Sequence, residues 1–145
     1  MRLFLAGIIQ GSMVEATVHG QDYRQQIKDL LAVHLPQAEV YDPVAGHQNS
    51  IEYDDETGRR VFFGHNAMCR EIDVLLAVVP EASMGTAVEM WEAYQHGAAV
   101  IAISPLAYNW AVRFLSHAIY PTVGAFAEAL AAGEVARRID DVLAR

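Results

Sequence analysis

One carboxylate stands out as a candidate for chemistry because of the residues that precede it. Glu89 ends the segment Ser83-Met84-Gly85-Thr86-Ala87-Val88-Glu89. In a helix, residues three and four positions apart share a face, so Glu89 lies behind Gly85 and Thr86. Ser83 can cap such a helix, and a bare first turn leaves its N–H groups open to an anion. The pattern predicts a working carboxylate that overlooks an anion-binding helix start.

Two apolar runs, at residues 73–79 and 98–103, flank this segment and must position it. Both runs are short and rich in aliphatic residues, which is typical of buried parallel strands. The helix between them is expected to begin at Ser83 and to end at Gly97. A glutamate in a helix is most often a solvated surface residue, and we expect that of Glu92. Glu89 differs because small residues around it leave space for a ligand.

The rest of the chain alternates between apolar runs and helical patterns, which predicts right-handed βαβ units and a parallel sheet. The sequence therefore predicts a single-domain α/β fold over residues 1–145, flavodoxin-like or Rossmann-like, with a parallel five-stranded sheet and helices on both faces. Further strands are expected at 2–9, 38–41 and 118–120, and further helices at 23–34, 59–71, 108–116, 122–130 and 133–143. The helix at 59–71 is expected to bury Val61, Phe62, Met68 and Cys69.

The ends of three predicted strands converge on one edge of the sheet, where ligands bind in open α/β folds. Gly7 and Gly11 permit close backbone approach there, and Gln10 and Ser12 supply neutral hydrogen-bonding groups. These four residues are therefore candidates for substrate binding. The turn has neither the dinucleotide fingerprint nor a Walker A lysine, and a tight strand-to-helix turn is the alternative. The converging segments are 7–12, 42–49 and 80–85, with an expected active-site loop at 13–20.

Composition limits the possible partners and cofactors. The net charge of −8 and the pI near 5.1 argue against binding to a nucleic-acid polymer or an anionic membrane. Cys69 is the single cysteine, which excludes an intrachain disulfide and favours a reduced, cytoplasmic location. The six histidines lack the spacing of a metal-binding pair, so no metal and no other cofactor is expected. The apolar N-terminus is too short to span a membrane and reads as a strand.

Three blocks together resemble the nucleoside 2-deoxyribosyltransferase family, which includes the 2′-deoxynucleoside 5′-phosphate N-hydrolases and related pyrimidine-nucleotide glycosidases. The blocks are residues 4–12, 72–77 and 83–89, and the order of elements matches over about residues 2–110. The resemblance implies that Glu89 is the nucleophile. It would attack C1′ of the sugar and form a covalent glycosyl-enzyme, which water or a second base then resolves. Ser83, Gly85 and their N–H groups would face the 5′ end of the substrate.

The chain departs from the family pattern at two positions. Where the N-hydrolases have an arginine, this chain has Gln10, which cannot form an ion pair with a phosphate. The family usually has an aspartate near the leaving base, and the matching residue here is His65. A histidine can donate a proton to a base nitrogen near neutral pH. Asp54 or Asp55 of the polar 42–56 segment is the alternative acid, and His65 is then a solvent-facing helix residue.

The resemblance also implies a homo-oligomer, dimeric or larger, because in the deoxyribosyltransferase branch a polar residue reaches into a neighbouring subunit's site. Asn109 is the candidate for that residue, and its alternative role is to cap a helix. The aromatic stretches 91–94 and 108–110 are candidate contact surfaces. The predicted function is cleavage or transfer at the N-glycosidic bond of a (deoxy)nucleoside or nucleoside 5′-monophosphate through glycosyl-Glu89. The alternatives are a non-catalytic nucleotide-binding or sensor protein of the same fold, and an NAD-type glycohydrolase.

Overall fold

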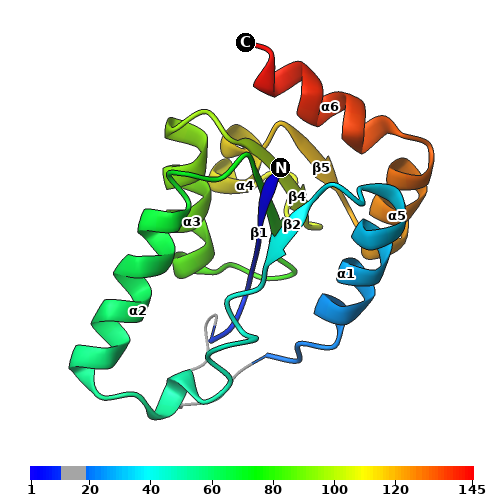
Figure 1. Ribbon diagram of the computed structural model, residues 1–145. Helices are drawn as coiled ribbons and strands as arrows, with labels where there is room; N and C mark the ends of the chain where they lie inside the picture. Colours follow the sequence, from blue (N-terminus) through cyan, green and yellow to red (C-terminus); the bar gives the residue numbers. More distant parts are fainter. Residues whose placement is uncertain (11–18) are drawn as a thin grey trace.

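A computed structural model describes residues 1–10 and 19–145. Five strands form one parallel sheet in the order β2-β1-β3-β4-β5 (Figure 1). This strand order is the flavodoxin-like one. It confirms the predicted α/β class and favours the flavodoxin-like over the Rossmann-like arrangement. The strands are β1 (Arg2–Gly7), β2 (Glu39–Tyr41), β3 (Val74–Val78), β4 (Ala99–Ile103) and β5 (Ala118–Tyr120).

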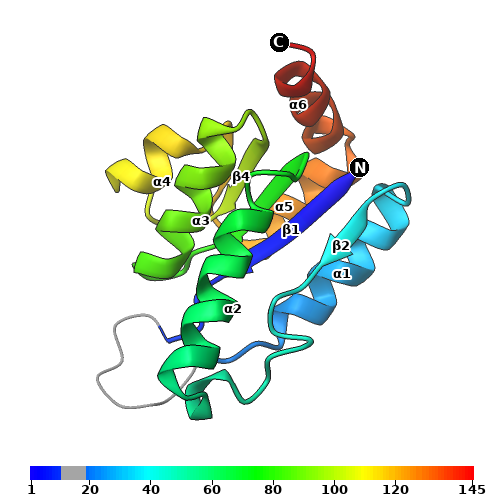
Figure 2. The same cartoon turned by 60° about the vertical axis from the view of Figure 1, so that its left-hand side comes forward.

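Helices cover both faces of the sheet, as predicted. Helices α1, α5 and α6 pack on one face, and α2, α3 and α4 lie on the other (Figures 1 and 2). In the described part of the chain, no helix has the length and apolar character needed to cross a membrane. The helices are α1 (Tyr23–His34), α2 (Asp55–Met68), α3 (Met84–Gln95), α4 (Trp110–Leu115), α5 (Val123–Ala131) and α6 (Glu134–Leu143), with a short 3-10 turn at Ser50–Glu52.

The core forms two layers because the strands alternate their side chains between the two faces. Leu5 of β1 faces the layer that contains Phe126 of α5, and Phe4 faces the layer that contains Met90 of α3. All residues of β3 and β4 are buried. Coverage on both faces explains why these strands are continuous apolar runs.

The strand order places a crevice at the carboxyl ends of β1 and β3. β1 has β2 on one side and β3 on the other, so the connections leave the sheet in opposite directions there. Ligands bind at this point in doubly wound sheets. Gly7 pairs with Val78 across the two strand ends. The end of β1 therefore lies beside the segment that leads from β3 into α3.

Helix α2 differs from its prediction in two respects. It begins at Asp55 rather than at residue 59, because the Asp54 side chain accepts a hydrogen bond from the Thr57 N–H at 2.7 Å and caps the helix. Its predicted buried side is wrong at Phe62, which is 46% exposed, whereas Asn66 and Cys69 are buried. The reason is that α2 packs against α3, and Phe62 faces a cavity rather than the core.

Candidate active site

A cavity of about 370 Å³ opens at the carboxyl edge of the sheet. It lies between the start of α3, the end of β1 and the segment that leads from β2 into α2, which is where the strand order predicts a ligand site. The cavity is lined by Gly7, Ile9, Gln10, Pro43, His47, Ser50, Tyr53, Gly58, Val61, Phe62, His65, Ser83, Met84, Gly85, Thr86 and Glu89. It therefore brings together every predicted site residue that the structure describes except Asn109.

Glu89 lines the cavity and is half-buried. Burial raises the pKa of its carboxyl to about 8, and the Arg24 guanidinium partly opposes this rise. The desolvated carboxylate form is therefore the less stable one at neutral pH and the more reactive one. A carboxyl group that is shifted this far inside a cavity is a candidate for nucleophilic or acid–base chemistry. The neighbouring Glu92, by contrast, forms an ion pair with Arg70 at 2.9 Å outside the cavity.

The start of α3 has the predicted open geometry. The Ser83 Oγ accepts a hydrogen bond from the Thr86 N–H at 3.3 Å and caps the helix. A Cβ added at Gly85 would meet no atom within 4 Å, so the first turn is bare on that side. Ser83, Met84 and Gly85 line the cavity. Because the first N–H groups of a helix have no acceptor within it, this helix start can bind an anion there.

Gly7 is a glycine for a different reason from the one expected. A Cβ at this position would collide with the Tyr23 hydroxyl and would lie 3.2 Å from the Arg24 Nη2 and 3.3 Å from the Val78 carbonyl oxygen. The glycine thus makes room for two side chains of α1 behind the strand. Gln10 lines the cavity as expected. The predicted residues Gly11 and Ser12, and most of the predicted 13–20 loop, lie outside the described residues.

The wall contributed by α2 and the segment before it is aromatic. His47 Nδ1 lies 2.9 Å from the Tyr53 hydroxyl, and His65 Nε2 lies 3.1 Å from the Tyr41 hydroxyl. The two imidazole rings meet edge to face, with centroids 5.3 Å apart. Burial, and to a smaller extent His47, lowers the pKa of His65, so its imidazole is mainly neutral at pH 7. Flat rings of this kind provide a surface against which a planar base can pack.

The remaining candidates lie outside this cavity. Asp54 is exposed and caps α2, and the Thr57 N–H lowers the pKa of its carboxyl, which weakens it as a proton donor. Neither Asp54 nor Asp55 lines the cavity around Glu89. Asn109 caps α4 by accepting hydrogen bonds from the Ala111 and Val112 N–H groups. It borders a smaller neighbouring hollow that also includes Ser83.

Sequence reasoning missed a buried charged group beside the site. Arg24 is 3% exposed and forms an ion pair with Asp42 at 3.0 Å. Its Nη1 also donates to the Leu5 carbonyl oxygen at 2.8 Å. A signal was present, because Arg24 falls on the same helical face as Ile27 and Leu31, which are buried. His47 and Tyr53 were also missed, although His47 belongs to the 42–49 segment that is expected at the ligand-binding edge of the sheet.

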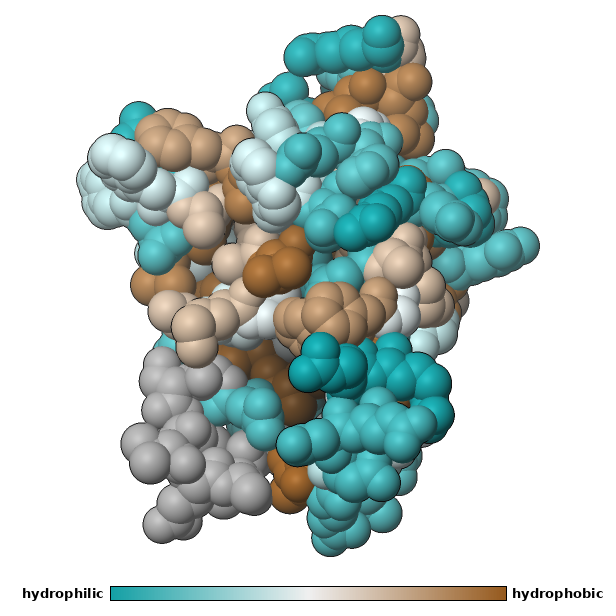
Figure 3. Space-filling view, turned by 90° about the vertical axis from the view of Figure 1, so that its left-hand side faces the viewer, coloured by the Kyte–Doolittle hydropathy of each residue, from teal (hydrophilic) through white to brown (hydrophobic). Residues whose placement is uncertain are grey.

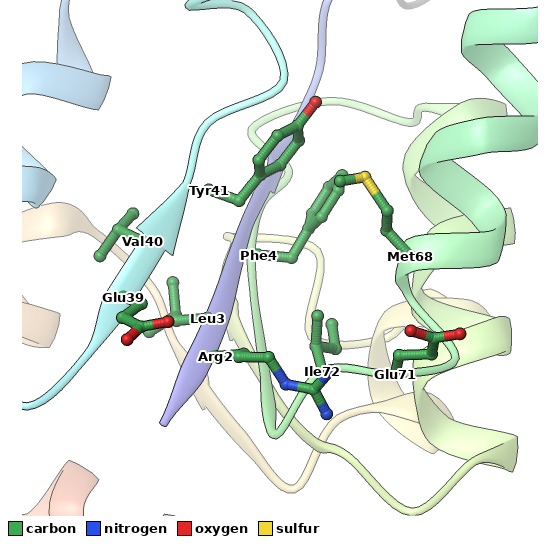
Figure 4. Close-up of a pocket in the computed structure, with 9 residues that line it drawn as sticks. All are labelled: Arg2, Leu3, Phe4, Glu39, Val40, Tyr41, Met68, Glu71 and Ile72. Carbon is green, nitrogen blue, oxygen red and sulfur yellow. The ribbon is translucent and has the colours of Figure 1, made fainter.

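A second hollow, of about 450 Å³, lies between β1, β2 and α2. Figure 4 shows Phe4, Tyr41 and Met68 pointing into its apolar end. Its two carboxylates, Glu39 and Glu71, are exposed, unlike Glu89. Chemistry by a desolvated carboxylate is therefore better supported in the first cavity, and the second hollow contributes the Tyr41 hydroxyl that contacts His65.

Comparisons with known proteins agree with this fold. No protein-family model and no curated protein sequence matches the chain. The structure of the 2-deoxyribosyltransferase from Bacillus psychrosaccharolyticus matches with a TM-score of 0.65 at 16% identity, over 92% of this chain and 90% of that one. The CMP N-glycosidase of Clostridium botulinum matches with a TM-score of 0.50 at 19% identity, over 91% and 99%. The chain thus shares its fold with a 2-deoxyribosyltransferase and a CMP N-glycosidase, which agrees with the fold that the three sequence blocks imply.

Proposed function

We propose that the protein cleaves the N-glycosidic bond of a (deoxy)nucleoside or nucleoside 5′-monophosphate and passes the sugar to water or to a second base. Glu89 is the nucleophile. The observation that carries this proposal is the position of Glu89, half-buried in a cavity between a bare helix start and an aromatic wall. The fold shared with a 2-deoxyribosyltransferase and a CMP N-glycosidase supports the same chemistry. This position favours catalysis over the sensor alternative, because binding alone does not require a desolvated carboxylate.

In the proposed complex, each of the three parts of the substrate lies against a different part of the cavity wall. The base packs against the rings of His47, Tyr53 and Phe62, and the sugar presents C1′ to Glu89. The 5′ end points to the first turn of α3, where N–H groups and the helix dipole favour an anion. Gln10 adds a neutral hydrogen-bonding group but no charge, so a 5′-phosphate would depend on the helix start.

The proposed reaction has two steps with oxocarbenium-like transition states. In the first, the ionised Glu89 forms a bond to C1′ as the bond from C1′ to the base nitrogen breaks, and the electron pair leaves with the base. His65 donates a proton to the departing base. In the second step, water or another base attacks C1′ and releases Glu89. His65 is better placed for proton donation than Asp54, because only His65 lines the cavity.

The test is release of free base from a panel of nucleosides and their 5′-monophosphates, followed by chromatography. Glu89→Gln should lower the rate by on the order of 10³-fold or more, because it removes the nucleophile. The matched control is Glu92→Gln on the same helix, which alters the contacts with Arg70 and His96 outside the cavity and should keep most of the activity. A fully active Glu89→Gln variant would contradict the assignment. Tight binding without base release by the wild-type protein would favour the sensor alternative.

The proposed assembly is a homo-oligomer formed through the outer face of α3 and α4. Met84, Val88 and Trp91 follow one another along α3 and are at least 39% exposed, and Trp110 and Phe114 of α4 are at least 55% exposed. Figure 3 looks onto the side of the molecule that faces left in Figure 1, where apolar residues are exposed among polar ones. Exposed patches of this kind mark interaction surfaces. Light scattering after size-exclusion chromatography should give a dimer or a larger species, and a monomer would contradict this assembly.

The proposed location is the cytoplasm. Cys69 is free and buried, in keeping with a reducing compartment. Fractionation of the cells that express the protein would test this location.

A further inference from the structure

The proposed chemistry does not account for the buried Arg24. Its Nε donates to the Gln21 side chain at 2.6 Å, and its Nη1 donates to the Leu5 carbonyl oxygen and pairs with Asp42. Among the described residues, its Nη2 has no hydrogen-bond partner, and neither has the Tyr23 hydroxyl. Leaving a buried guanidinium N–H unpaired is costly, so a position of this kind calls for an explanation.

The unpaired groups lie directly behind the active-site strand. The Arg24 Nη2 and the Tyr23 hydroxyl are the atoms that a Cβ at Gly7 would meet, and Gly7 lines the cavity of Glu89. The end of β1 thus has the Arg24 guanidinium on its α1 side, while its Gly7 lines the same cavity as Glu89. Any residue larger than glycine at this point would displace the two side chains.

The charge cluster around Arg24 is positive overall. Asp42 is 7% exposed and is shared by two cations, Arg24 at 3.0 Å and Lys28 at 3.3 Å. One carboxylate therefore faces two positive charges. Because Lys28 is 33% exposed, water screens it, and Arg24 supplies most of the field that reaches the cavity.

The other described titratable groups around Glu89 contribute little charge near pH 7. Burial raises the pKa of Tyr23 on α1 and of the Cys69 thiol after α2, so both stay neutral. Burial lowers the pKa of His65 on α2, which is mainly neutral as well. His47 lies beside His65, with its Nδ1 against Tyr53. Arg24 is accordingly the cation that opposes the effect of burial on Glu89.

We propose that Arg24 is a positioning residue that favours the ionised, nucleophilic form of Glu89 through its charge, and that Asp42 moderates this effect. The inference rests on the proposed function of Glu89. It assigns a role to helix α1, none of whose residues lines the cavity. It also explains why the first strand must end in a glycine at this position.

The experiment measures the pKa of Glu89 directly from the side-chain ¹³C carboxyl resonance, assigned by its loss in Glu89→Gln. In the full chain, Arg24→Gln should raise this pKa by about one unit, because a positive charge is lost nearby. Asp42→Asn should lower it, because Arg24 then acts without its partner. Lys28→Gln, the exposed-cation control, should cause a smaller shift than Arg24→Gln.

The two main variants separate charge from structure because both break the same ion pair. A purely structural role of the pair would shift the pKa of Glu89 in the same direction in both variants. That outcome, or an unchanged pKa in Arg24→Gln, would overturn the inference. If Arg24→Gln does not fold, the Asp42→Asn variant is sufficient as a test. An unchanged or raised pKa of Glu89 in Asp42→Asn would contradict the proposal. Arg24→Lys should restore part of the effect because it keeps the charge.

This measurement does not depend on turnover, so the two proposals can fail separately. Base release by the wild-type protein together with an unchanged pKa in Arg24→Gln would reject the role of Arg24 and leave the proposed function intact. Opposite shifts in the two variants without base release from any substrate would reject the proposed function, while the charge effect on Glu89 would stand. When both hold, the pH profile of kcat/KM should move in the same directions as the pKa.

Discussion

Helices α2 and α3 begin near the same cavity, yet their N-termini are built for different purposes. Both are capped by a side-chain oxygen, Asp54 for α2 and Ser83 for α3. The first turn of α2 then carries Asp55 and Glu56, whose charges complement the helix dipole. The first turn of α3 carries no acidic residue, and Gly85 leaves it bare. The difference indicates that α3 can bind a ligand through the N–H groups of its first turn, whereas α2 can contact a ligand only through its side chains.

The largest effect within this comparison is expected at His65, the residue of α2 proposed as the proton donor, which lines the same cavity as Glu89. His65→Gln should lower kcat by about 10²-fold for substrates whose base needs a proton to leave, because a donor is lost. Steady-state kinetics with several nucleosides measures this effect. Asp54→Asn, which changes the cap of α2 outside the cavity, is the control and should keep most of the activity. If Asp54→Asn lost more activity than His65→Gln, the proton donor would be Asp54 rather than His65.

The pH dependence of kcat/KM should reflect the ionisation of both Glu89 and His65. Glu89, with its pKa raised to about 8, must lose a proton to attack, and His65, with a lowered pKa, must hold one to donate it. The protein with ionised Glu89 and protonated His65 is then a minor form. We expect kcat/KM to decrease at pH values below the pKa of His65 and at pH values above about 8. In His65→Gln the basic limb should disappear, so that kcat/KM rises up to about pH 8 and then levels off. An unchanged profile in this variant would exclude His65 as the acid.

A smaller effect is expected from making α3 resemble α2. Gly85→Glu places a carboxylate in the first turn, where there is open space for it. Repulsion should weaken binding of nucleoside monophosphates by about tenfold and change nucleoside binding much less. Thermal shift with each ligand measures the difference. Gly64→Glu adds the same charge to α2 outside the cavity and serves as the control. Equal loss for both ligands would argue against a phosphate at this helix start.

The smallest effect concerns the caps themselves. Ser83→Ala should cost about 1 kcal/mol of stability, because the Thr86 N–H loses its acceptor. Asp54→Ala should also lower the Tm through the Thr57 N–H. Chemical denaturation of both variants measures these losses. Only Ser83→Ala should also weaken ligand binding, and a binding loss in Asp54→Ala would erase the distinction between the two helices.

The sequence predicts those parts of the site whose signals are local. The α3 motif shows its cap, its bare turn and Glu89 within a few residues, and the fold follows from the alternation of apolar runs and helical patterns. The start of α2 was misplaced although Asp54 and the acidic residues after it are helix-start signals. Their acidic side chains are equally compatible with a polar segment that supplies a catalytic acid, and an apolar helix residue such as Phe62 usually packs in the core.

Other parts of the site depend on tertiary contacts that no local pattern contains. Arg24 meets Asp42 only because β2 lies next to β1, and His47 meets His65 only because the chain folds back along α2. Gly7 illustrates the same limit. Its need for close approach was predicted, but the groups that fill the space come from α1 rather than from a substrate.

The most direct test of the account is to trap the covalent intermediate. A nucleoside with fluorine at C2′ destabilises the oxocarbenium-like transition state and should slow breakdown of the glycosyl-enzyme. Intact-mass spectrometry should then show the wild-type protein heavier by one fluorinated sugar, and peptide mapping should place the adduct on Glu89. The Glu89→Gln variant should carry no adduct, while Glu92→Gln should be labelled like the wild type. An adduct that persists in Glu89→Gln, or one that maps to another residue, would contradict the central claim.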